Sequence, residues 1–232
     1  MWRATACRRR GQWEQRARGR HGVAPLSRVT EQAKALDGRL TGVITLTTVS
    51  VRSVAELAAL TERGQSFTYL MFWGHQPERD GRPGRGCLSQ WWPARFEVDG
   101  LAYPSAEHYM MWSKAVLFGD DETAQRILES GSPERAKALG RQVRGFQNET
   151  WQAHRFAIVV RGNLAKFGQH DPLKTYLVGT GERVLVEASP LDPVWGIGLA
   201  ADDPRATDPA QWPGANLLGF ALMDVRERLR VS

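Results

Sequence analysis

Short runs in which apolar and polar residues alternate predict the strands of this protein. The aromatic run FTYLMFW at 67–73 has strand composition, and RVLVEA at 183–188 is a second apolar run of similar length. Residues 94–103 alternate on both sides of the dipeptide Asp99-Gly100, which suits the tight turn between paired strands. The pattern therefore predicts a β-hairpin and two further strands.

Longer segments with apolar positions three or four residues apart predict helices. The best defined follows Ser105, a natural N-cap, and continues with good helix formers until Gly119. Further helices are expected at 54–63, 120–130, 133–141, 148–167 and 215–230. Helices outnumber strands and their order is mixed, so the sequence predicts an α+β fold, a compact and mostly helical domain with a small β-sheet.

Residues 1–60 differ from the rest of the chain in charge and pattern. The chain has a formal net charge of +6, and residues 1–20 hold seven arginines against Glu14, so the remainder is formally neutral. Apart from a weak Thr/Val strand signal at 43–51, we expect a basic, disordered extension over 1–60 and a folded domain over 65–232. The extension is either a phosphate-binding arm or an upstream segment without function. The second is favoured because short Arg-rich tails are common and non-specific.

Composition and motifs exclude several classes of protein. The two cysteines, Cys7 and Cys87, lie far apart, which fits a reducing cytoplasm better than a disulfide framework or a zinc site. No apolar run approaches the roughly 18 residues of a membrane span, so no membrane partner is expected. The motifs H-E-x-x-H, C-x-x-C, G-x-S-x-G and the Walker loop are absent, so neither a metal nor a cofactor is expected.

The helix after Ser105 carries the first candidate chemistry. Glu107, Met111 and Lys114 are spaced by four and three residues and share one helix face, while His108 lies on an adjacent stripe. Glu107 could enter a pocket as an acid, a base or an electrostatic partner. Spacing alone favours an ordinary surface Glu/Lys pair.

Tryptophans in loop-like sequence form the second candidate feature. Trp91, Trp92 and Trp195 lie among Pro and Gly residues, where an indole ring could stack on a flat heterocycle or line a sugar pocket. They could equally seal the core beneath the loops, and the sequence leaves both interpretations open.

The segment 191–219 is the third candidate feature, because it is longer and more irregular than a compact domain normally tolerates without a function. Asp192 lies three residues before Trp195-Gly196 and could present a carboxylate across a cleft from Glu107. Asn216 is expected to cap the final helix. The segment is either an active-site loop or a solvated surface loop.

Four motifs in a fixed order carry a family resemblance. LSQWWPARFEVDGLAYPSAEHYMMWSKAVLFGD at 88–120, the helix that contains Trp151, DPVWGIGL at 192–199 and NLLGFALMDVRERL at 216–229 together resemble the YbiA-like/NADAR family. The resemblance covers about residues 67–230. It implies a compact α+β N-glycosidase that acts on ribosylamino-pyrimidine intermediates of riboflavin synthesis or removes ADP-ribose from guanine bases.

The resemblance also implies site residues. Glu107, Trp151, Asp192 and Trp195 match the functional positions of the family, and Lys114 and Asn216 match its pattern. From these and their neighbours we expect Glu107, Asp192 and Lys114 to be catalytic, with substrate contacts from the following residues: Ser89, Trp91, Trp92, His108, Trp151, Trp195, Gly196 and Asn216. Gln90-Trp91 departs from the Asn-Phe that often follows the family's serine, which would alter base selection.

Two mechanisms fit these residue types. Breaking a C1′–N bond builds positive charge on the sugar, so Glu107 and Asp192 could divide the roles of charge stabilisation and proton transfer. Lys114 could instead attack ring-opened ribose and form a Schiff base. The expected substrate is a small nucleotide or an ADP-ribosylated nucleic acid, and a module that binds ADP-ribose without hydrolysing it is the competing hypothesis.

Overall fold

Two parallel strands from distant parts of the sequence pair with each other. The computed structural model describes residues 51–231, and in it β1 (Tyr69–Phe72) pairs with β4 (Val184–Glu187) from Tyr69 opposite Val184 to Phe72 opposite Glu187. Val184, Leu185 and Val186 are buried, as expected of a strand covered on both sides. Because the strands are parallel, both carboxyl ends lie at one edge, where Glu187 ends β4.

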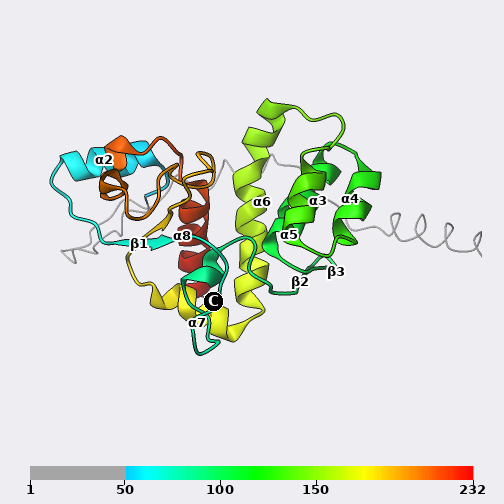
Figure 1. Cartoon of the computed structure of the whole chain (residues 1–232), viewed down its shortest axis with the longest axis horizontal. Helices are drawn as coiled ribbons and strands as arrows, with labels where there is room; N and C mark the ends of the chain where they lie inside the picture. The colour runs from blue at the N-terminus through cyan, green and yellow to red at the C-terminus, as the bar shows by residue number, and fades with distance from the viewer. Residues whose placement is uncertain (1–50, 232) are drawn as a thin grey trace, which may run out of the picture. The chain divides into compact units, whose positions relative to one another are not determined.

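Helix α6 lies in the middle of the view in Figure 1. In Figure 1, α3, α4 and α5 lie on one side of α6, and α7 and α8 lie on the other. The elements in chain order are α2 (Val54–Glu62), β1, η2 (Arg85–Leu88), β2 (Phe96–Val98), β3 (Leu101–Tyr103), α3 (Ala106–Leu117), α4 (Asp121–Leu128), α5 (Pro133–Gly140), α6 (Asn148–Gly168), α7 (Asp171–Gly179), β4, η3 (Pro204–Thr207), η4 (Pro209–Gln211) and α8 (Leu217–Arg230). This arrangement confirms the predicted α+β fold with more helix than sheet.

The predicted hairpin and the helix after it are both present. Strands β2 and β3 are antiparallel, and the two turn residues, Asp99 and Gly100, have φ angles of 52° and 78°, as a two-residue hairpin turn requires. Ser105 caps α3, and its hydroxyl oxygen accepts the backbone N–H of His108. Gly119, with a φ of 70°, follows the helix in the left-handed conformation that commonly ends helices.

Two glycines allow helices to approach closely. A Cβ atom at Gly162 of α6 would lie 2.4 Å from the ring of Tyr109, so the glycine inside this long helix serves packing against α3. A Cβ atom at Gly140, the last residue of α5, would lie 2.1 Å from the sulfur of Met111. The absence of both side chains sets how near α5 and α6 come to α3.

The structure adds one helix and changes one boundary. Helix α7 was not predicted, because its apolar signal rests mainly on Leu173 and Leu177. The strand signal at 43–51 lies almost wholly outside the described residues. The expected extension over 1–60 shares its last ten residues with the domain, since Val51 and Leu57 are buried and α2 packs on η4. Within residues 51–231, no helix combines the length and apolar character that crossing a lipid bilayer requires.

We expect Leu57→Ala to lower the free energy of unfolding by about 2–5 kcal/mol, because it removes a wholly buried side chain and leaves a cavity. Chemical denaturation measures the change. Glu62→Ala, at the exposed end of the same helix, is the matched control and should change stability by less than about 0.5 kcal/mol. Equal stability of both variants would show that α2 is not part of the domain core.

Candidate functional site

A cavity of about 350 Å³ lies where α3, α5 and α6 meet the carboxyl end of β4. Seven of the eleven residues predicted from the sequence line it: Ser89, Trp91, Glu107, Lys114, Trp151, Asp192 and Trp195. All three residues expected to be catalytic are in this group. Their roles remain predictions, but the structure brings them into one space.

Helix α3 directs one face into the cavity. Glu107, Met111 and Lys114 all line it, so the surface-pair interpretation of the Glu/Lys spacing is wrong. The Lys114 ammonium donates to the carbonyl of Gly140 at 2.8 Å and lies 4.2 Å from the centre of the Phe146 ring. Burial lowers the pKa of Lys114, because the neutral amine is favoured away from water.

Glu107 is a buried carboxyl group with an unsatisfied oxygen. Only 2% of the residue is exposed, and its Oε1 has no hydrogen-bond partner within residues 51–231. The pKa of Glu107 is raised to about 7, mainly by burial; Lys137 opposes this shift, and the negative charge of Asp192 adds to it. A carboxyl group of this kind exchanges its proton near neutral pH, as general acid–base catalysis requires.

Glu187 is a second such carboxyl group, which the sequence analysis missed. It lines the cavity, and its buried Oε2 also lacks a hydrogen-bond partner in the described part of the chain. Burial raises the pKa of Glu187 to about 8, with smaller contributions in the same direction from Asp192 and Glu107. The available signal was an acid that directly follows the buried run Val184–Val186 at a strand end.

Asp192 is held more firmly than either glutamate. Its Oδ1 accepts the backbone N–H groups of Val194 at 3.0 Å and Trp195 at 2.9 Å, which fixes the turn that directs Trp195 into the cavity. Its Oδ2 lies 3.9 Å from the ammonium of Lys137. Asp192 therefore shapes the loop in addition to contributing charge.

Three basic side chains also line the cavity. Lys137 lies on α5, Arg141 directly follows α5, and Arg155 lies on α6. Neither guanidinium forms an ion pair or hydrogen bond with another described residue, which leaves both available to an anionic ligand. Arginine suits phosphate because its planar group donates two parallel hydrogen bonds.

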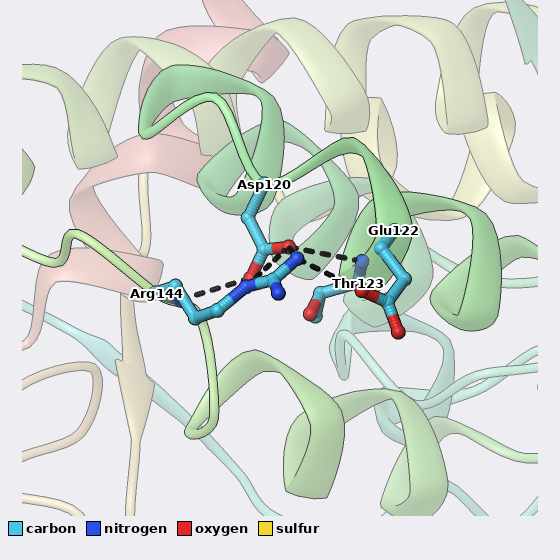
Figure 2. A network of polar contacts seen from close by, with 4 residues as sticks. All are labelled: Asp120, Glu122, Thr123 and Arg144. Carbon is cyan, nitrogen blue, oxygen red and sulfur yellow. Dashed lines mark hydrogen bonds and ion pairs between the residues drawn. The ribbon is translucent and has the colours of Figure 1, made fainter.

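A polar network fixes the chain that follows α5 (Figure 2). The carboxylate of Asp120 accepts the backbone N–H of Arg144 at 2.9 Å and its guanidinium at 2.6 Å. The same carboxylate caps α4 by accepting the N–H of Thr123 at 3.2 Å. The bonds from Arg144 hold the pKa of Asp120 well below its usual range, so the network persists at neutral pH and ties the end of α5 to the start of α4.

Buried Lys166 fixes the segment that supplies Ser89, Gln90 and Trp91. Its ammonium donates to the carbonyls of Cys87 at 2.7 Å and Ser89 at 2.8 Å. Gln90, at the position where the sequence departs from the family pattern, lines the cavity and accepts a hydrogen bond from Asn163 at 2.8 Å. Its side chain is therefore both part of the wall and fixed from behind.

Four predicted substrate-binding residues do not line the cavity. His108 is 1% exposed, and its ring contacts the Ser105 hydroxyl and the Ser130 carbonyl, so it joins α3 to the end of α4. Trp92 packs against the hydrophobic core, and Gly196 lies where a Cβ would be 2.6 Å from the Glu187 carbonyl.

Asn216, the fourth of these residues, stands at the expected N-cap position of α8, but its side chain makes no capping hydrogen bond. Its amide nitrogen donates to Leu185 O at 2.9 Å, and its Oδ1 accepts Glu187 N–H at 3.0 Å. Its side chain is wholly buried and bridges two peptide groups of β4. Asn216 therefore fixes the backbone from which Glu187 projects.

Comparisons with known proteins agree with this arrangement. A family model for the NADAR domain matches residues 71–230. An N-glycosidase of Acanthamoeba polyphaga mimivirus is 42% identical over 164 residues, which are 68% of this chain and 95% of that protein. N-glycosidase YbiA of Escherichia coli is 31% identical over 141 residues, which are 61% of this chain and 78% of that protein.

The fold comparison leads to the same group of proteins. The NMR structure of the Escherichia coli protein YbiA matches with a TM-score of 0.58 at 26% identity, and the match covers 72% of this chain and 88% of that one. Every residue that lines the cavity falls inside the segment matched by the family model. The chain therefore belongs to the NADAR domain family.

Proposed function

We propose that this chain hydrolyses the bond between ribose C1′ and a base nitrogen in a substrate that carries phosphate. The enzyme class, a hydrolase of N-glycosyl compounds, is that of its named N-glycosidase relatives. The observation that carries the finer proposal is that acidic and basic side chains line the same cavity. Glu107, Glu187 and Asp192 line it together with Arg141 and Arg155, whose guanidinium groups form no ion pair or hydrogen bond with another described residue.

This arrangement suits the chemistry of N-glycoside hydrolysis. Cleavage of a C1′–N bond leaves positive charge on the sugar, which a nearby carboxylate stabilises in a site shielded from water. Glu107 and Asp192 line the wall where the ribose ring would lie. Trp91, Trp151 and Trp195 provide aromatic surfaces on which a base or ribose would be held in register.

The basic side chains narrow the substrate class. Lys137, Arg141 and Arg155 would bind a ribose 5′-phosphate or the diphosphate of ADP-ribose. Two substrates meet this description: a ribosylamino-pyrimidine phosphate and ADP-ribosyl-guanine in nucleic acid. The same side chains would also bind ADP-ribose without turnover, so the deciding measurement is hydrolysis.

We expect wild-type protein to hydrolyse at least one of these two substrates, and we expect Glu107→Gln to lower turnover about a hundredfold or more. The substitution preserves shape while it deletes the titrating group that faces the cavity. Turnover is measured side by side for both substrates, by chromatographic detection of the free base that is released. Glu97→Gln, on the exposed strand β2, is the matched control and should keep full activity.

If neither substrate is hydrolysed and ADP-ribose binds tightly, the proposed N-glycosidase function is wrong and the chain is a module that binds ADP-ribose without hydrolysing it. Unchanged turnover in a folded Glu107→Gln variant would remove Glu107 from the mechanism.

The same substitution should stabilise the protein at alkaline pH. A glutamate titrates near 4.3 in an unfolded chain, whereas burial raises the pKa of Glu107 to about 7. The folded state binds this proton more tightly, so the free energy of unfolding falls as pH rises between these two values. Glu107→Gln should match wild type near pH 4 and exceed it by about 3 kcal/mol above pH 8. Urea unfolding at both pH values measures the difference, and a difference independent of pH would contradict the expectation.

Borohydride trapping separates the two mechanisms that remain open for Lys114. A neutral amine at this position could condense with the aldehyde of ring-opened ribose, and the lowered pKa of Lys114 favours that form. Its hydrogen bond to Gly140 and its contact with Phe146 equally suit a lysine that only positions other groups. If Lys114 is the nucleophile, reduction during turnover should leave a ribose adduct on Lys114 that mass spectrometry detects. Repeated absence of an adduct in a sample that is turning over would favour direct attack by water.

A further inference from the structure

Two carboxyl groups in the cavity are unsatisfied, and only one of them is used by the mechanism above. Glu107 Oε1 and Glu187 Oε2 are both buried, and neither accepts or donates a hydrogen bond within residues 51–231. A buried carboxylate without a partner is costly in free energy. Two of them in one cavity are more costly still, because the negative charge of Glu107 raises the pKa of Glu187. The pair therefore keeps at least one proton at neutral pH.

Asp192 is engaged in other contacts. One of its oxygens accepts two backbone N–H groups, and the other faces the ammonium of Lys137. Its charge raises the pKa of both Glu107 and Glu187.

The surroundings favour ionisation of Glu107 more than that of Glu187. Two cations, Lys137 and Arg141, and a hydrogen bond involving the Trp91 side chain favour the ionised form of Glu107. Among the described residues, Lys137 is the cation that favours ionisation of Glu187. The negative charges of Asp192 and Glu107 both oppose ionisation of Glu187.

We propose that Glu187 is the catalytic acid of this site, a carboxyl group that gives its proton to the departing base nitrogen while ionised Glu107 faces C1′. This inference rests on the proposed N-glycosidase function. It assigns the proton-transfer role to a residue outside the set predicted from the sequence. Asp192 keeps the loop and Trp195 in place.

The proposed step balances as a hydrolysis. The C1′–N bond breaks and its electron pair stays on nitrogen, which takes the proton of the Glu187 carboxyl group. Water adds its oxygen to C1′, and the proton that water loses returns to the Glu187 carboxylate. One water molecule is consumed, no oxidant or reductant is needed, and Glu187 is ready for the next turnover.

The backbone around Glu187 is rigid enough for this role. Its N–H donates to the Asn216 side chain at 3.0 Å, and its carbonyl accepts the N–H of Ile197 at 2.9 Å. Gly196 packs against the same carbonyl with no room for a side chain. A proton donor must stay within hydrogen-bond reach of its acceptor, and these contacts hold the Cα of Glu187 in place.

The proposal gives the turnover rate a bell-shaped dependence on pH. The productive state has one proton on the glutamate pair, and its two apparent pKa values belong to the pair. The charged groups that line the same cavity are Lys114 on α3, Lys137 on α5, Arg141 directly after α5, Arg155 on α6, and Asp192. The rate falls below the lower value, where Glu107 becomes protonated, and falls above about 8, where Glu187 loses its proton.

The first test titrates Glu187 without any substrate. In protein labelled with ¹³C at the glutamate Cδ, the NMR signal that disappears in Glu187→Gln belongs to Glu187. We expect this signal to titrate near pH 8, and at a lower pH in Glu107→Gln, because a neighbouring negative charge is removed. A midpoint near the ordinary glutamate value of about 4.3 would overturn the proposal.

The second test measures kcat and KM against pH for whichever of the two substrates is hydrolysed. We expect Glu187→Gln to lower kcat about a hundredfold, to leave KM within about threefold, and to abolish the decline in rate above pH 8. Glu187→Asp, which keeps an acid, should retain that decline. Glu97→Gln is the control that should behave as wild type.

The outcomes separate the role of Glu187 from the proposed function. A folded Glu187→Gln variant with wild-type kcat would overturn the role of Glu187 alone, as would an equal loss in kcat with an unchanged pH profile. If wild-type protein hydrolyses neither substrate, the proposed function fails, and the catalytic role of Glu187 fails with it.

Discussion

The side chain of Asn216 is the contact on which the cavity depends. It is wholly buried, in a left-handed conformation with a φ of 50°, and its amide bonds the carbonyl of Leu185 and the N–H of Glu187. Its own backbone N–H bonds the carbonyl of Gly196 at 3.0 Å. One residue therefore joins the end of β4, the loop that carries Asp192 and the start of α8. A side chain without both a donor and an acceptor could not make this connection.

The electrostatics of the cavity run against stability. Three carboxyl groups line one cavity, and the ammonium group of Lys137 lies 3.9 Å from Asp192. Arg141 and Arg155 line the same cavity and form no ion pair or hydrogen bond with another described residue. Charged groups that are not fully neutralised inside a cavity retain an electric field that a charged ligand can complete. Such an arrangement is expected of sites where activity outweighs stability.

The features that the sequence predicted correctly are those determined by contacts between residues close together in the chain. The helix after Ser105 and the hairpin at Asp99-Gly100 followed from caps and turn residues within a few positions of each other. The parallel pairing of β1 with β4 depends on segments far apart in sequence, and no short pattern signals it. The sequence around Glu187 shows an acid at a strand end, but the cavity beside it is formed by distant segments. His108 was predicted to contact substrate because it lies next to Glu107 in the sequence, yet its ring forms a hydrogen bond with the Ser105 hydroxyl inside the fold. The family motifs identified the cavity, and the structure was needed to show which residues of those motifs face it.

The close approach at Gly140 has a consequence for the width of the cavity. The last residue of α5 has no side chain, its position is filled by the sulfur of Met111, and its carbonyl receives Lys114. Helix α5 carries Lys137 and is directly followed by Arg141, so the gap between α5 and α3 is set by a hydrogen atom where other residues have a methyl group. A side chain at this single position would push α5 away from α3, and it would shift both the Gly140 carbonyl that receives Lys114 and the ammonium group of Lys137 beside Asp192.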